Sequence, residues 1–250
     1  MNVELIDYTG MGHPDQFWAA KKLIYIKSTR LERSMENYDR IMDLDGEALE
    51  EELKGIVMSI RSSWEFVHWT FEVTGISRAC VDQILRTRHG SYAVQAMRVV
   101  DMGSFDMVMP ETVRGNPMAK EIWTVAHESL QLSISALKDL DIPNQDSRGL
   151  VPMNAKTNFN ADWNLRTFSD ICAKRDNLRA QGEYTEFVVE LRKKIYEIMP
   201  WTKTFLEPDR TSTPSLLQIM KKELGDSGPL DKPLVNEALK EIDMLKAAWG

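Results

Sequence analysis

The segment Trp64–Val73, WEFVHWTFEV, constrains the fold more than any other part of the chain. It is rich in aromatic and β-branched residues, which favour β-strands. We therefore predict a strand that Gly75 breaks, followed by a helix over Arg78–Arg88 with Ser77 as its N-cap. The apolar residues expected to face inward on this helix are Cys80, Val81, Ile84 and Leu85.

The rest of the chain alternates helices with a few separated strands. Helical spacing of apolar residues predicts helices over Asp15–Lys27, Glu47–Arg61, Pro117–Leu140, Arg166–Lys174 and Glu183–Met199. Extended segments are predicted over Asn2–Tyr8, Tyr92–Val100 and Asn154–Asp162, with a loop over Asp101–Asn116. The chain lacks a regular βαβ rhythm and a GxGxxG motif, which disfavours a Rossmann domain. The pattern predicts the α+β class, with an antiparallel sheet flanked by helices.

The 250 residues suffice for one large domain and an appendage. Pro200 and Pro208 close the main body, so we place the domain over residues 1–208. Residues 209–250 contain two short amphipathic segments joined by GDSGPLDKP. They are predicted to form a helical C-terminal appendage or an oligomer contact.

Charge and cysteine usage bound the functional class. The net charge of -7 argues against a whole-surface nucleic-acid binder, although a local basic pocket is compatible with it. Cys80 and Cys172 show no metal-ligand spacing, so no metal site is predicted, and they fit a reducing cytoplasm. The N-terminus lacks signal-peptide features, and no apolar run approaches the ~20 residues of a membrane helix.

The arginines are gathered in two segments. From charge alone these are solvated helix faces, and the alternative is a binding site for anions. The two groups are Arg78, Arg86, Arg88 and Arg98, and then Arg148, Arg166, Arg175 and Arg179.

The first arginine segment lies in FEVTGISRACVDQILRTRHGSYAVQAMR, Phe71–Arg98. This stretch resembles the signature of the flavin-dependent thymidylate synthases: an apolar strand, G-I-S-R-A, a Gln three residues before R-H-R, then a Ser and a further Arg. The matching residues are Gly75, Ile76, Ser77, Arg78, Ala79, Gln83, Arg86, Arg88, Ser91 and Arg98.

A second block, RGLVPMNAKTNFNADWNLRTFSDICAKR, resembles the family's R-x-x-L-P-x-N-x-x-T followed by N-x-R and a later Arg. QGEY, which follows it, resembles the family's A-Q-x-E. The two blocks cover about half of the chain in the family's order and separation. The matching residues are Arg148, Pro152, Asn154, Thr157, Asn164, Arg166 and Arg175.

The resemblance implies a role for each matching position. The residues that would contact FAD are Ser62, Arg86, Thr87, Arg88, His89, Asn164, Leu165 and Arg166, with Asp170 on the ribityl side. Those that would surround the nucleotide are Gln83, Arg86, Ser91, Arg98, Arg148 and Arg175. Arg98 and Arg148 would hold the phosphate. Arg175 would be catalytic, because its charge stabilises an anionic N3 and raises the electron density at C5.

The implied reaction is methylation of dUMP at C5 to give dTMP. NADPH reduces the bound FAD, methylene-tetrahydrofolate supplies the carbon, and the reduced flavin delivers hydride to complete the methyl group. No enzyme cysteine is required, so Cys80 and Cys172 are expected to be core residues. The resemblance also implies a homotetramer with active sites at subunit interfaces, where the two arginine groups would meet.

The sequence departs from the family pattern in ways that resemble divergent bacteriophage members. Three histidines of the pattern are absent: the central His of R-H-R is Thr87, and two upstream histidines are Ile60 and Phe66. Three polar residues are replaced by Ala93, Val94 and Ala96. An Asn and a further His are replaced by Asp170 and Arg179. These changes leave dCMP or UMP as alternative substrates and a hydroxymethyl group as an alternative product. A non-catalytic nucleotide- or RNA-binding homologue and a structural helical protein are the remaining alternatives.

Several of these residues also have purely structural interpretations. Arg78 is expected to pair with Asp82, and Asp170 with Lys174 as an alternative to the flavin. Trp64 and Trp69 are expected to be core residues, and His68 is expected to be a packed or edge histidine of the strand. His89 is expected to replace the missing motif histidine or to end a helix. The helix Pro117–Leu140 is expected to be scaffold or subunit interface.

Overall fold

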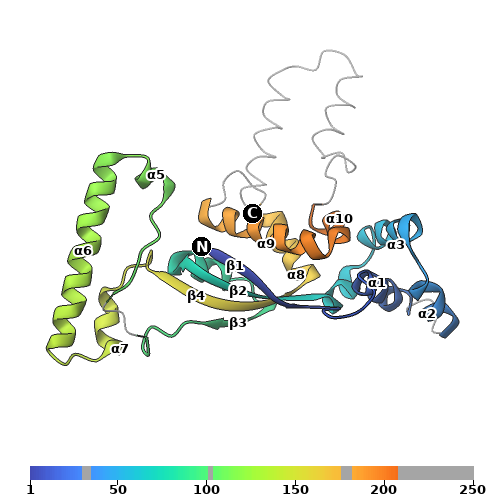
Figure 1. Cartoon of the computed structure of the whole chain (residues 1–250), viewed down its shortest axis with the longest axis horizontal. Coiled ribbons are helices and arrows are strands. Elements are labelled where there is room, and N and C mark those ends of the chain that lie inside the picture. The colour runs from blue at the N-terminus through green and yellow to red at the C-terminus, as the bar shows by residue number, and fades with distance from the viewer. Residues whose placement is uncertain (30–34, 101–103, 176–181, 208–250) are drawn as a thin grey trace, which may run out of the picture. The chain divides into compact units, whose positions relative to one another are not determined.

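The computed structural model describes residues 1–29, 35–100, 104–175 and 182–207. Its centre is a four-stranded antiparallel sheet with the strand order β1-β2-β4-β3 (Figure 1). The strands are β1 (Asn2–Tyr8), β2 (His68–Ser77), β3 (Gly90–Val94) and β4 (Lys156–Asn164). Non-consecutive strands β2 and β4 form the middle of the sheet, so its core joins segments far apart in the sequence.

Helices make up most of the remaining described chain. The α-helices are α1 (Trp18–Ser28), α2 (Met35–Met42), α3 (Gly46–Val57), α4 (Arg78–Ile84), α5 (Glu111–Arg114), α6 (Pro117–Asp139), α7 (Asn144–Ser147), α8 (Leu165–Arg175), α9 (Gly182–Ile198) and α10 (Lys203–Leu206). Three 3₁₀ helices are described, η1 (Arg61–Phe66), η2 (Arg148–Leu150) and η3 (Pro200–Thr202). This content confirms the predicted α+β class.

One face of the sheet carries the main core. Along β4 the burial alternates, with Thr157, Phe159, Ala161 and Trp163 buried and the residues between them more exposed. Helices α8 and α9 lie over the buried face (Figure 1), because their apolar stripes pack into the same cluster. Within the described chain the opposite face is polar, so the sheet is covered by helices on one side rather than flanked on both.

The strand predicted from Trp64 starts later than expected. Residues Arg61–Phe66 form the 3₁₀ helix η1, and Trp64 is 1% exposed within the core. Gly75 does not break β2 but lies inside it, with φ at +72°, where the register between β2 and β4 shifts. Glycine adopts this conformation without steric cost, so the strand passes through an irregularity and continues to Ser77. Trp69 is also buried, as predicted, whereas His68 is exposed at the start of the strand.

The helix after β2 begins as predicted and ends early. Ser77 caps α4, because its hydroxyl accepts a hydrogen bond from the amide of Cys80 at 3.1 Å. The helix stops at Ile84 rather than Arg88, and Leu85 is 37% exposed instead of buried. Strand β3 covers only Gly90–Val94 of the extended segment predicted to Val100.

The other helices differ from prediction mainly at their ends. Helix α6 keeps the predicted proline at its start, and the side chain of Asn116 caps it. Helix α3 ends at Val57, short of Arg61, and the short helices α2 and α5 were not predicted. Helix α2 has only eight residues, which is shorter than the window over which a helical period can be recognised.

Helix α6 packs on a second, smaller core made of Phe105, Ile134 and Ala155. His127 and Gln131, one turn apart, both contact the carbonyl oxygen of Phe105, at 2.8 and 2.7 Å. Residues 1–207 form one compact unit, and the predicted appendage, residues 209–250, lies outside the described residues. None of the helices described here combines the length and the apolarity needed to cross a membrane.

Candidate active site

The residues predicted to contact a flavin gather at the Asn164 end of β4. The amide of Leu165 donates to the carbonyl of Val67 at 2.8 Å, which joins the start of α8 to the end of η1. Across this junction Arg166 of α8 forms an ion pair with Glu65 of η1 at 2.6 Å. Ser62 lies in the same 3₁₀ helix. Two segments separated by about a hundred residues thus form one surface.

The turn between α4 and β3 is fixed against the same end of the sheet. The hydroxyl of Thr167 donates to the carbonyl of His89 at 2.9 Å, and Asn164 accepts a hydrogen bond from the amide of Thr167 at 2.9 Å. Asn164 thereby caps the first turn of α8. The turn carries Arg86 and Arg88, both exposed. The predicted set of Ser62, Arg86, Thr87, Arg88, His89, Asn164 and Arg166 therefore belongs to neighbouring elements.

Two members of the predicted flavin set have other surroundings than expected. Leu165 is 0% exposed, so its side chain belongs to the core and only its main chain could reach a ligand. Asp170 pairs with Arg61 of η1 at 3.3 Å, and the predicted local pair with Lys174 does not form. The guanidinium of Arg61 also lies over the ring of Trp64, 4.9 Å from its centroid. Packing between η1 and α8 brings these charges together, and helical spacing alone could not predict it.

A second group of residues lies at the Lys156 end of β4. A pocket of about 330 Å³ opens there, between the start of α4 and the segment that leads into β4. Main-chain hydrogen bonds from Arg78 to Ala155 and from Ala79 to Met153 hold these two segments together, at 3.1 and 2.8 Å. The residues that line the pocket are Arg78, Met97, Gln145, Arg148, Gly149, Val151, Pro152 and Met153.

Arg78 belongs to this pocket and does not pair with Asp82 as predicted. Its Nη1 atom lies 3.4 Å from the carbonyl oxygen of Gln95, to which it donates. Arg148 donates through Nε to the carbonyl of Gln145 at 3.1 Å, which leaves its two terminal nitrogens for a ligand. Arg98 lies one residue after Met97 of the pocket wall and is exposed. Arg78 is thus a candidate binding residue that sequence reasoning assigned to a local ion pair.

The third group lies under the helices, around Arg175 at the end of α8. The guanidinium of Arg175 stacks on the ring of Tyr184, with its carbon 3.7 Å from the ring centroid. The Tyr184 hydroxyl lies near the side chain of Thr87, so Arg175 lies near the Arg86–Arg88 segment. Burial raises the pKa of Tyr184, which keeps its hydroxyl protonated. Gln83 of α4 is half-buried and Ser91 of β3 exposed.

The arginines of the described chain divide into two kinds. Arg40, Arg61, Arg114, Arg166 and Arg192 each pair with a carboxylate. In the same described ranges, no carboxylate pairs with Arg78, Arg86, Arg88, Arg98, Arg148 or Arg175. In a chain with a net charge of -7, guanidinium groups without carboxylates mark sites where an anion would be bound.

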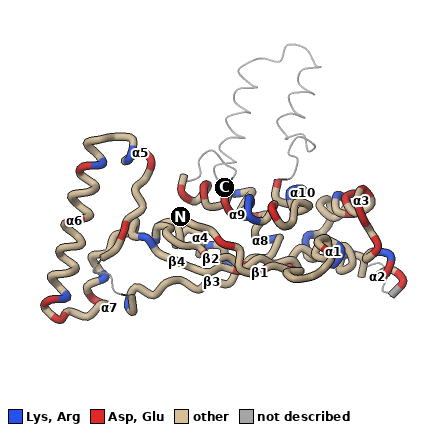
Figure 2. Tube along the Cα trace, in the orientation of Figure 1, with Lys and Arg blue, Asp and Glu red and all other residues tan. Residues whose placement is uncertain are grey.

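Two of the candidate surfaces lie at opposite ends of β4. Figure 2 shows basic residues beside α7 and, separately, along α8. The nine residues of β4 span about 26 Å at about 3.3 Å per residue, and they separate the pocket of Arg148 from the surface around Arg166. Ser91 pairs with Asp162 and lies on the polar face of the sheet, opposite the helices. A single subunit therefore presents parts of a site at both ends of its sheet.

Neither cysteine is placed for covalent catalysis. In the described chain Cys80 and Cys172 form no disulfide, and both are fully buried, which confirms that they are core residues. Burial, together with the nearby carboxylate of Glu183, raises the pKa of the Cys80 thiol to about 12. The chemistry of this site consequently does not depend on a thiolate.

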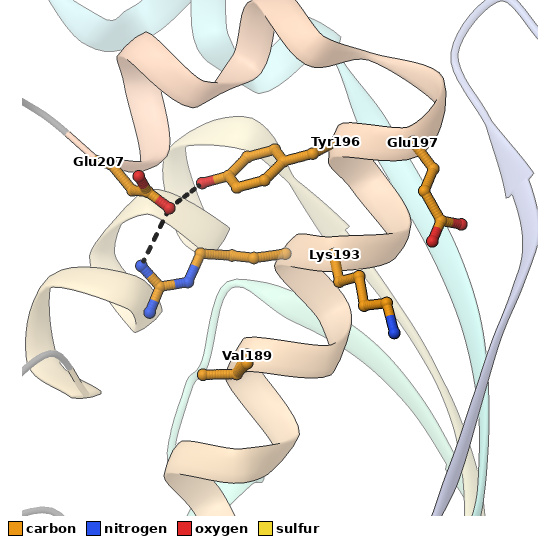
Figure 3. Close-up of a pocket in the computed structure, with 6 residues that line it drawn as sticks. Val189, Lys193, Tyr196, Glu197 and Glu207 are labelled. Atoms are coloured by element: carbon orange, nitrogen blue, oxygen red, sulfur yellow. Dashed lines mark hydrogen bonds and ion pairs between the residues drawn. The ribbon is translucent and has the colours of Figure 1, made fainter.

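A larger pocket of about 580 Å³ lies on the outer side of α9 (Figure 3). Its centre is the hydroxyl of Tyr196, which donates to Glu207 at 3.0 Å, with Arg192 3.9 Å from the same carboxylate. Val189, Lys193 and Glu197 complete its lining. None of the residues predicted to bind flavin or nucleotide lies here, so we place the candidate site at the sheet ends.

Among the described residues, arginines without carboxylate partners lie at the ends of an α+β sheet, an arrangement typical of proteins that bind phosphorylated ligands. Comparison with known proteins gives the family. Residues 4–201 match the Thy1 family, described as thymidylate synthase complementing protein. The chain therefore belongs to this family of enzymes, the flavin-dependent thymidylate synthases, and the alternative of a purely helical structural protein is wrong.

Relatives with the name flavin-dependent thymidylate synthase come from archaea and bacteria. The Thermococcus onnurineus protein is 27% identical over 214 residues, which cover 81% of this chain and 84% of that protein. The Haloarcula marismortui protein is 27% identical over 201 residues, or 67% of this chain and 80% of the relative. The Nitratidesulfovibrio vulgaris protein is 30% identical over 170 residues, or 63% and 69%. These identities agree with a divergent member.

Proposed function

We propose that this enzyme methylates C5 of dUMP to give dTMP, with FAD, NADPH and methylene-tetrahydrofolate. The observation that carries the proposal is the set of guanidinium groups without carboxylate partners at the motif positions of a family member. A nucleoside monophosphate and a flavin dinucleotide are both anionic, and arginine forks bind phosphates in bidentate geometry. Their negative charges would balance the arginines that have no carboxylate partner among the described residues.

The Asn164 end of the sheet fits a flavin dinucleotide. The exposed guanidinium groups of Arg86 and Arg88 suit its diphosphate, and the N-terminal turn of α8 adds a positive dipole. Asn164 and Ser62 offer hydrogen-bonding groups beside them. Asp170 already pairs with Arg61, so in the proposed site it orients this arginine toward the ribityl side. The bound flavin supplies the hydride that completes the methyl group.

The Lys156 end fits the phosphate of the nucleotide. Arg148 contributes its terminal nitrogens, and Arg98 and Arg78 extend the positive surface of the pocket. Gln83 carries a donor and an acceptor suited to a base or ribose edge, and Ser91 carries a hydroxyl. Arg175 supplies the charge for the pyrimidine ring, where a cation favours the N3 anion and so raises electron density at C5.

The proposed site needs more than one subunit. The Arg148 pocket and the Arg166 surface lie about 26 Å apart along β4, so we propose that Arg148 of one copy meets Arg86 and Arg175 of another. Helix α6 offers a surface for such assembly. Its exposed residues Met118, Ile122, Val125, Ser129, Leu132 and Ala136 recur at alternating spacings of four and three. This is the seam of a helix pair, and it supports the homotetramer that we propose.

Because the sequence departs from the family motif, the base and the sugar of the substrate are a second question. Ile60 and Phe66, in place of two histidines, are 62% and 50% exposed beside the proposed flavin surface. Apolar side chains at these positions change which ligands can approach the flavin. They favour, as the alternative to methylation of dUMP, a reaction with dCMP or UMP or a hydroxymethyl product. A homologue that binds nucleotide without turnover is the remaining candidate.

The test incubates the full-length protein with FAD, NADPH and methylene-tetrahydrofolate and offers dUMP, dCMP and UMP separately. We expect a yellow protein, tritium release from 5-tritiated dUMP, and a product heavier by one methyl group. Arg148→Ala should weaken nucleotide binding by about 10- to 100-fold, as for a charged hydrogen bond. Arg114→Ala, which removes an exposed pair with Glu111, is the matched control. A colourless protein that takes up no FAD refutes the proposal.

A further inference from the structure

Thr87, the residue in place of the motif's central His, is held from two sides. Its carbonyl oxygen accepts a hydrogen bond from the hydroxyl of Tyr92 at 2.7 Å. That hydroxyl in turn accepts one from Nε1 of Trp163 at 2.9 Å. Trp163 is 1% exposed and belongs to the main core. Hydrogen bonds thus connect the backbone of the Arg86–Arg88 segment to the main core.

Tyr184 connects this fixed segment to Arg175. The tyrosine is 2% exposed in the first turn of α9, and its ring lies under the guanidinium of Arg175 at 3.7 Å. Its hydroxyl lies near the side chain of Thr87. The next residue back, Glu183, accepts a hydrogen bond from the amide of Ser77 at 2.8 Å, which fixes the start of α9 against the end of β2.

We infer that Tyr184 is a positioning residue that fixes the guanidinium of Arg175 against the pyrimidine ring, with Thr87 as the anchor of its hydroxyl. The inference rests on the proposed function, because it names how the charge for the N3 anion is held. An arginine side chain has many rotamers, and ordering them costs entropy. A buried aromatic face attracts a guanidinium and restricts its plane, so the ordering is complete before the nucleotide binds.

The chemistry of the contact fits this role. The face of the Tyr184 ring carries negative electrostatic potential, and it draws the guanidinium onto the ring without neutralising its charge. A carboxylate in the same place would cancel the charge that the N3 anion needs. Among the described residues no carboxylate pairs with Arg175, so its full charge faces the ligand. Burial keeps Tyr184 neutral, because it raises the pKa of the phenol.

The experiment compares three variants of the full-length protein with FAD bound. Tyr184→Phe keeps the ring under Arg175 and removes the hydroxyl group that lies near Thr87. Tyr184→Leu removes both interactions. Tyr196→Phe, which removes a half-buried hydroxyl bond to Glu207 from the same helix, is the matched control. Nucleotide KM, kcat for tritium release, its pH profile and the melting temperature are measured for each.

We expect a graded loss. In Tyr184→Leu, kcat/KM should fall about 30-fold, mainly in kcat, as for a desolvated cation–π contact. Its tritium release should reach half its maximum at higher pH than in the wild type, because a displaced Arg175 no longer lowers the pKa of N3. Tyr184→Phe should lose about threefold. Tyr196→Phe should retain wild-type kinetics and an unchanged pH profile.

Two results overturn the inference. The first is a Tyr184→Leu variant whose kcat and pH profile equal those of the wild type. The second is an equal loss of kcat/KM in Tyr184→Leu and Tyr196→Phe. Should Tyr184→Leu not fold, Tyr184→Phe decides, and wild-type kcat and pH profile in that variant then overturn the inference. A wild type that releases no tritium from any pyrimidine nucleotide refutes the proposed function itself, which distinguishes the two failures.

Discussion

Replacement of Gly90 by alanine tests how closely the turn between α4 and β3 packs against the core. A Cβ atom at Gly90 would lie 2.6 Å from Cδ1 and 2.7 Å from Nε1 of the Trp163 indole, and 3.0 Å from the Tyr92 hydroxyl. Real Cβ atoms do not approach other atoms so closely. Either the indole or the turn between His89 and Ser91 must move.

The indole has no room to move. Trp163 is 1% exposed, and four aromatic rings lie around it with centroids 5.9 to 6.2 Å from its own: Phe71, Tyr92, Phe168 and Phe187. A shift would also break its 2.9 Å hydrogen bond to Tyr92. Overpacking costs about 1–3 kcal/mol and a lost hydrogen bond about 1 kcal/mol. We therefore expect Gly90→Ala to lower the free energy of unfolding by about 3 kcal/mol.

The assay is thermal unfolding followed by near-ultraviolet circular dichroism, which reports the packing of the indole. For a chain of this size about 3 kcal/mol corresponds to a fall in Tm of about 6–12 °C. Gly55→Ala is the matched control, because a Cβ at this helical position in α3 meets no atom within 4 Å. There the smaller backbone entropy of alanine should raise stability by about 0.5–1 kcal/mol. A Tm for Gly90→Ala within about 2 °C of the wild type would refute the reasoning.

Three further predictions follow from burial, charge and exposure. Burial alone would raise the pKa of Asp15, but the hydrogen bonds from Lys21 at 2.8 Å and from the amide of Phe17, together with the charge of Lys21, outweigh burial and lower that pKa. Asp15→Asn should therefore cost about 1 kcal/mol near neutral pH, and urea titrations should show this difference disappear as the pH falls through the folded-state pKa. Cys80, with a pKa of about 12, should resist alkylation in the native protein at about pH 8 and react only after denaturation, by mass spectrometry. Val125→Glu, on the exposed seam of α6, should weaken self-association at least about tenfold in sedimentation runs, whereas Thr124→Glu, outside the seam, should leave it unchanged.

The sequence predicted which residues belong to the candidate site but not how they are arranged in space. Motif spacing identified Arg86, Arg98, Arg148 and Arg175, and all of them lack carboxylate partners in the described chain. The spacing could not show that Arg78 turns to the pocket beside Arg148, because that depends on which loop packs against the start of α4. Ion pairs between η1 and α8 escaped prediction for the same reason.

The sequence by itself determined the elements whose cause is local. A period near 3.6 residues predicted α6 and α9, alternation predicted β1, and the side chain of Ser77 marked the start of α4. Such signals arise among residues a few positions apart, so no knowledge of the rest of the chain is needed to recognise them.

Only the tertiary structure decided what meets across long sequence distances. It placed Gly75 in an irregularity of a continuous strand, set Tyr184 between Thr87 and Arg175, and separated the Arg148 pocket from Arg166 by the length of β4. These outcomes depend on strand order and helix packing, which are set by the burial of apolar surface across the whole domain. For the same physical reason, the assembly of the site from several subunits that we propose depends on tertiary structure and not on local sequence signals.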